Sequence, residues 1–178
     1  MKREWKRLET WLQKHAPKTY ASLNPGASEA TLDRLAARLG FPLPRQLRAY
    51  LSIHDGQPAD CLKAVHDGWI LLSAESIATT RDTFNSLLHR GDFNGRAAES
   101  CDGMAKAVWW SEKWIPIMES PGGDYLVVDL DPAESGDRGQ VTEFLHDDGD
   151  REVKARDLRT LLELFRDELE EQGGDEDE

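Results

Sequence analysis

Two His-Asp pairs, His54-Asp55 and His146-Asp147, are the residues of this sequence best suited to acid-base or metal chemistry. Imidazole and carboxylate groups bind divalent cations, and a metal-dependent hydrolase would use several of them together. One candidate set comprises Asp129, Asp131, His146 and Asp147. Both pairs nevertheless lead into glycine-containing turns, where aspartate accepts hydrogen bonds from nearby backbone groups. We therefore expect turn and strand-end roles, with no metal and no cofactor.

Common catalytic motifs are absent from the sequence, which contains no GxxxxGK[ST], GxGxxG, GxSxG or HExxH pattern. The two cysteines, Cys61 and Cys101, form no CxxC pair, and a reducing cytoplasm is the expected location. No apolar run approaches the roughly 18 residues of a membrane span, and no hydrophobic stretch follows Met1 as in a secretory signal. These features predict a cytoplasmic protein that is not an enzyme and does not bind membranes.

The charge is negative and unevenly distributed. The 178 residues carry a net charge of -12, which disfavours a nucleic-acid binder that neutralises phosphates. Eight carboxylates and no basic residue lie in 167–178, and residues 119–152 hold eleven carboxylates against Arg138 and Arg151. Such a field favours encounter with a basic protein, although acidic turns and tails also serve solubility alone.

The spacing of apolar residues predicts the helices and strands that position these residues. Helical patterns occupy the stretches 5–16, 28–40, 45–56 and 74–88, and Leu158, Leu161, Leu162, Phe165 and Leu169 predict a final amphipathic helix. Ser28 and Ser73 are expected helix caps. Residues 69–72, 107–117, 124–130 and 140–145 favour strands, whereas 89–107 is expected to be an irregular connection.

Helices first, strands in the middle and a helix last predict an α+β fold, with helices packed on a mostly antiparallel sheet of about four to six strands. We expect one domain over residues 1–166 and an acidic, at least partly disordered tail over 167–178. In the strand after Asp124, one face is apolar, while the face carrying Tyr125, Val127 and Asp129 is mixed. That mixed face is either half covered by a helix or open to a partner.

Several motifs occur in an order that resembles the SUKH superfamily, in the branch named for fungal cell-wall assembly regulators of the Smi/Knr type. The motifs are Asn24-Pro25-Gly26-Ala27, Leu43-Pro44, His54-Asp55-Gly56-Gln57, Trp69 to Ser73, Trp114 to Ile117, Gly122-Gly123-Asp124, Val128-Asp129-Leu130, and Gly139-Gln140-Val141 with Phe144 and His146-Asp147. The resemblance spans roughly residues 5–165. It implies a SUKH-like α+β domain and carries over no catalytic residue.

For bacterial members, the resemblance implies an immunity protein that neutralises a cognate toxin, often a nuclease, by binding it. For fungal members, it implies a regulator linked to cell-wall and glucan synthesis. A nuclease cleft is usually basic, so we expect an acidic partner-binding surface with one aromatic anchor. The expected residues are Asp55, Asp60, Trp110, Asp124, Asp129, Asp131, Asp147 and Asp148.

The six tryptophans leave a further alternative open. Exposed indole rings would suit a carbohydrate-binding module, whereas apolar neighbours at helical and strand spacing favour core packing for most of them. Trp109 and Trp110 are adjacent, so in an extended strand their rings would lie on opposite faces.

Overall fold

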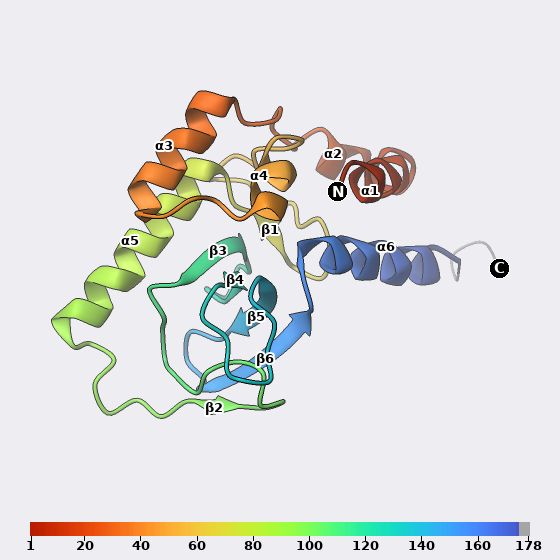
Figure 1. The fold of residues 1–178 in the computed structure, drawn as a ribbon. Helices are drawn as coiled ribbons and strands as arrows, with labels where there is room; N and C mark the ends of the chain where they lie inside the picture. Colours follow the sequence, from red (N-terminus) through yellow and green to blue (C-terminus); the bar gives the residue numbers. More distant parts are fainter. Residues whose placement is uncertain (175–178) are drawn as a thin grey trace.

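A computed structural model describes residues 1–174 of the chain. Its helices and strands follow one another as α1 (Lys2–His15), α2 (Pro17–Tyr20), α3 (Glu29–Leu39), α4 (Arg45–Leu51), β1 (Ile70–Leu71), α5 (Ala74–Arg90), β2 (Glu99–Ser100), β3 (Trp114–Glu119), β4 (Tyr125–Asp129), β5 (Gln140–Phe144), β6 (Asp150–Ala155) and α6 (Leu158–Gly174) (Figure 1). The predicted α+β class is therefore confirmed.

The strands form one sheet in the order β1-β3-β4-β5-β6-β2. Every pairing is antiparallel except the short parallel contact between β2 and β6. Tyr125 at the start of β4 lies opposite Phe144 at the end of β5, and Asp129 lies opposite Gln140. The β3–β4 and β5–β6 turns consequently meet at one end of the sheet, and the β4–β5 loop lies at the other.

Helix capping follows the sequence closely. The Oγ of Ser28 accepts a hydrogen bond from Thr31 N, and the Oγ of Ser73 accepts one from Ser76 N, so both predicted caps are confirmed. Gly40 ends α3 in the left-handed conformation that glycine adopts without strain.

Alternation along the strands divides the core in two. Leu126 and Val128 pack in the main core with α1, α3, α4 and α6, while Val127 and Phe144 point to the opposite face. Figure 1 shows α5 and the connection after it on that second side of the sheet. They supply Phe84 and further aromatic rings to the cluster. The mixed face predicted for β4 is thus covered by the chain itself.

Two strands and a helix were not predicted. In β6, the alternating charges of Asp150, Arg151, Glu152 and Lys154 hide the strand pattern, and β2 lies within the segment expected to be irregular. The short helix α2 begins at Pro17, which suits a first helical turn. Helix α6 continues through Gly174, so residues 167–174 of the predicted tail are helical, and residues 175–178 lie outside the described part.

Candidate protein-binding surfaces

Three of the predicted acidic residues come together at one end of the sheet. Asp124 precedes β4, and Asp147 and Asp148 occupy the β5–β6 turn beside it. The Nδ1 atom of His146 lies 2.9 Å from Asp124 Oδ1 and 3.9 Å from Asp147 Oδ1. We call Asp124, His146, Asp147 and Asp148 the acidic corner. It is an exposed anionic surface with a single histidine within it.

Hydrogen bonding sets the charge state of the acidic corner. Partial burial opposes ionisation of Asp124, but hydrogen bonds from the side chain and backbone of His146 and from Ser120 outweigh it and lower the pKa of the carboxyl group. The hydrogen bond to Asp124 raises the pKa of His146. Both shifts favour the ionised pair.

One group of possible metal ligands lies within the acidic corner. Asp124, His146 and Asp147 offer ligand atoms within 4.8 Å of one another, and His146 Nδ1 is already hydrogen-bonded to Asp124. The candidate set of Asp129, Asp131, His146 and Asp147 is not assembled, because Asp129 ends β4, whereas His146 and Asp147 lie beside Asp124 at the start of that strand. The five residues of β4 alone span about 13 Å. The hydrolase alternative based on Asp129 and Asp131 is therefore wrong.

Asp129 and Asp131 shape the β4–β5 loop. Asp129 is 0% exposed, accepts hydrogen bonds from Asp131 N and Gln140 Nε2, and has its pKa raised by burial. Asp131 is half-exposed and lies 2.5 Å from Lys106 Nζ. Asp129 is thus unavailable to a partner, which corrects the expectation that it belongs to the acidic surface. Asp131 is accessible and paired with Lys106, and its role in partner binding stays a prediction.

The remaining predicted residues lie elsewhere. Asp55 Oδ1 accepts a hydrogen bond of 2.7 Å from Ala74 N, the first residue of α5, and Asp60 is exposed in the loop between α4 and β1. Trp110 is only 3% exposed, and its Nε1 donates to Asn85 Oδ1. Trp110 is therefore a core residue, and the expectation of an exposed aromatic anchor at this position is wrong.

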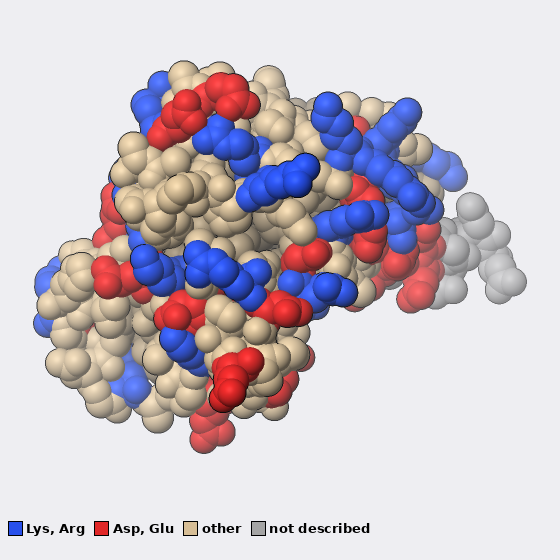
Figure 2. Space-filling model, in the orientation of Figure 1, with Lys and Arg blue, Asp and Glu red and all other residues tan. Residues whose placement is uncertain are grey.

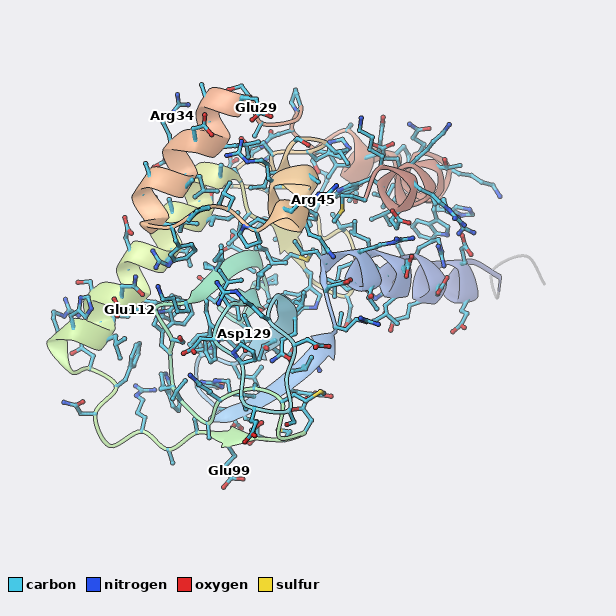
Figure 3. All side chains as sticks on the ribbon, viewed as in Figure 1. Glu29, Arg34, Arg45, Glu99, Glu112 and Asp129 are labelled. Carbon is cyan, nitrogen blue, oxygen red and sulfur yellow. The ribbon has the colours of Figure 1, made fainter. Side chains whose placement is uncertain are left out.

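A basic hollow lies at the other end of the sheet. Its volume is about 320 Å³, and its rim includes Arg45 at the start of α4, Arg138 in the β4–β5 loop and Arg156 before α6. Figure 3 labels Arg45 on α4, and Figure 2 shows lysine and arginine side chains gathered in a band across this face of the molecule. We call the hollow with these three arginines the arginine groove.

Polar contacts beneath the arginine groove fix its shape. Gln46 Nε2 donates to Asp157 Oδ2, and Arg159 N donates to Gln46 Oε1. Asp157 Oδ1 accepts from Thr160 N at the start of α6. The side chain of Gln46 therefore ties α4 to α6. Sequence reasoning missed this surface because its three arginines come from widely separated segments.

Comparison with known proteins assigns the class. The chain belongs to the SMI1 / KNR4 family (SUKH-1), whose profile matches residues 26–164. The match runs from the turn before α3 into α6 and includes every strand of the sheet. The predicted SUKH resemblance, in its Smi/Knr branch, is confirmed.

Individual relatives are fungal regulators and animal F-box proteins. The cell wall biosynthesis/cell cycle regulator smi1 of Schizosaccharomyces pombe is 28% identical, with 93% of this chain and 35% of the relative aligned. The glucan synthesis regulatory protein of Neurospora crassa is 25% identical, with 93% and 37% aligned. Human F-box only protein 3 is 37% identical over 57 residues, which cover 32% of this chain and 12% of the relative.

This chain spans about a third of the length of the two fungal relatives, which therefore contain extensive sequence beyond the shared domain. Within residues 1–174, no helix is both long and apolar enough to cross a membrane.

Proposed function

We propose that this chain is a cytoplasmic protein-binding domain that regulates a partner in cell-wall or glucan synthesis and catalyses no reaction itself. The supporting observation is the family match over residues 26–164, together with relatives named as regulators of these processes. Regulation by binding requires an exposed surface with complementary charge. The acidic corner supplies one such surface, and its ionised carboxylates suit a basic patch on the partner.

Crosslinking and affinity capture of the intact chain from its source cells test this proposal. The captured partner is then purified, and its activity is measured with and without the chain. The activity of a wall- or glucan-synthesis enzyme should change in proportion to the chain added and saturate at a fixed stoichiometry. An unchanged activity at saturating binding would contradict the regulatory role.

Charge-reversal variants test whether the acidic corner is the surface that contacts the partner. Asp147→Lys with Asp148→Lys should weaken capture at least tenfold, because opposite charges at the interface become like charges. A matched control with the same charge change is Glu29→Lys with Glu134→Lys, since both side chains are exposed and lie on α3 and in the β4–β5 loop, away from the acidic corner. Equal weakening in both double variants would show that net charge alone, and not the acidic corner, governs binding.

Neutralisation of a basic toxin, such as a nuclease, is the second candidate. The specific observation that favours it is the exposed acidic corner, in which the side chain of Asp147 is 77% exposed. Immunity proteins are normally encoded next to their toxins, so the neighbouring upstream gene is the one to express. Rescue of growth by the wild-type chain, lost with Asp147→Lys and Asp148→Lys, would support this candidate over regulation. Killing that persists at full expression of the chain would exclude that gene product as its toxin.

A further inference from the structure

The arginine groove differs from the sites in the described chain where an arginine is paired with a carboxylate. Arg38 pairs with Glu75 and Asp82, and Arg48 pairs with Glu29 and Asp33. Within residues 1–174, no carboxylate lies within ion-pair distance of Arg45, Arg138 or Arg156, and Arg138 Nη1 donates to the carbonyl oxygen of Leu130. Three guanidinium groups without a carboxylate partner thus surround one hollow in a chain with 34 acidic and 22 basic residues. This surface is therefore prepared for an anion from outside the chain.

The nearby carboxylates do not neutralise the groove fully. Both oxygens of Asp157 accept hydrogen bonds, from Thr160 N and Gln46 Nε2, and its carboxylate also interacts with the charge of Arg156. Asp137 is the second acidic residue of the lining and lies exposed at the rim. Three guanidinium groups against two carboxylates leave an excess of positive charge.

The floor of the groove is apolar and rigid. Leu47, Val128 and Leu158 line it, and each is almost fully buried in the main core. A volume of about 320 Å³ accommodates one anionic side chain and its neighbouring residues, but not a folded domain. The groove thus presents a basic rim over an apolar base to a short peptide segment.

We propose that the arginine groove binds a phosphorylated serine or threonine side chain in an extended segment of a partner protein. Guanidinium groups form paired hydrogen bonds with phosphate oxygens, and a dianionic phosphate matches several arginines better than a single carboxylate does. This inference deepens the proposed regulatory function and rests on it, because it makes partner binding dependent on phosphorylation.

The charge of the rest of the molecule selects a peptide over larger polyanions. A nucleic acid or an anionic bilayer extending beyond the groove would meet Asp137 at its rim and the acidic side chains that Figure 2 shows among the basic ones. A single phosphorylated side chain needs only the groove itself. At physiological ionic strength the Debye length is about 8 Å, so the three local arginines dominate the potential there.

Peptide binding to the purified full chain tests the inference. The probe is a fluorescein-labelled peptide library with phosphoserine or phosphothreonine at a fixed central position. Matched libraries carry serine, threonine or glutamate there. We expect the phosphorylated library to bind at least tenfold more tightly than the matched libraries, and inorganic phosphate to compete at millimolar concentration.

Substitutions of the rim arginines locate the binding. Arg45→Gln, Arg138→Gln and Arg156→Gln should each weaken binding about tenfold, and the triple variant should abolish it. All three side chains are exposed, so the variants should keep the wild-type circular dichroism and melting temperature. The matched control is Arg34→Gln, which removes one exposed arginine from α3 and should leave the affinity unchanged.

Other outcomes would overturn the inference. These are equal binding of the glutamate or unphosphorylated libraries, absence of binding by the phosphorylated library, full binding by the triple variant, and equal weakening by Arg34→Gln. Equally tight binding to phosphatidylserine vesicles would also overturn it. The assay leaves the acidic corner intact and uses no captured partner, so its failure is distinct from failure of the regulatory proposal.

Discussion

Replacing Arg151 with lysine is expected to destabilise the protein more than replacing it with methionine. Arg151 in β6 is 0% exposed. It points into the second core, the cluster that contains Trp110, Trp114 and Phe144. Its Nη1 donates to the carbonyl oxygens of Asp148 and Asp150, and its Nη2 donates to that of Trp109. The guanidinium carbon lies 4.8 Å from the centre of the Phe144 ring. A buried cation is therefore held by neutral carbonyl groups and aromatic faces.

Burial and hydrogen bonding of the Arg151 side chain make opposite contributions to the free energy of folding. Burial lowers the pKa of Arg151 from its usual value to about 10. Keeping the group charged at neutral pH therefore costs about 3 kcal/mol. Three hydrogen bonds from a charged donor and the aromatic contacts offset this cost, at about 1.5 kcal/mol or more for each hydrogen bond. Because the folded-state pKa of this base is lowered, the cost is relieved as the pH rises past about 10.

The two substitutions remove different parts of this balance. Lysine keeps the buried charge but cannot serve both groups of carbonyls with one ammonium, so we expect a loss of about 3 kcal/mol. Methionine removes the charge together with its desolvation cost and still fills the space, so we expect a loss of about 1 kcal/mol. For a chain of this length, these values correspond to melting temperatures lowered by about 6–12 °C and 2–4 °C respectively.

Unfolding in guanidinium chloride at pH 7, followed by tryptophan fluorescence and circular dichroism, measures both changes. Because Trp109, Trp110 and Trp114 surround the site, their near-ultraviolet signal also reports local packing. A lysine variant as stable as the methionine variant would refute the reasoning, because it would mean that the geometry of the guanidinium contributes nothing.

Three further predictions concern turns and pairs. Gly56→Ala should destabilise by at least about 3 kcal/mol in chemical unfolding, because Gly56 has φ of +61° and an added Cβ would lie 2.3 Å from the carbonyl carbon of Leu72. Asp55→Ala should cost about 1 kcal/mol in the same assay, since it removes the acceptor for the first N–H of α5. Asp124→Asn should lower the pKa of His146 toward 6.5 in an NMR titration. In the wild type, this pair stabilises the fold between the two shifted pKa values: the contribution of Asp124 is lost as the pH falls, and that of His146 is lost as the pH rises.

Elements with a regular apolar period were predictable, and strands filled by unusual residues were not. The helical spacing of apolar residues from Leu158 to Leu169 predicted α6 correctly, because the side of the helix that carries them is buried in the main core. β6 lacked such a signal, since its fully buried inward residue is Arg151. Trp110 was wrongly predicted to be exposed, because its position next to Trp109 indicated a ring on the open face of a strand. In the fold, that face is covered by the chain itself, and the ring is buried.

The acidic surface was predicted as one patch because residues close in sequence were treated as close in space. Asp124 precedes β4 and Asp129 is its last residue, so a strand of that length must hold them at opposite ends. Strand direction alone could have separated them. The arginine groove offered no comparable signal, because only the tertiary fold brings Arg45, Arg138 and Arg156 together.

The antiparallel order explains how one small sheet carries opposite charges at its two ends. The β3–β4 and β5–β6 turns share one end and contribute Asp124, Asp147 and Asp148, while the β4–β5 loop contributes Arg138 to the other. The length of β4 exceeds the Debye length at physiological salt, so each end acts on a ligand with little influence from the other. A net charge of -12 therefore does not describe either surface, and an anion-binding groove is compatible with an acidic protein.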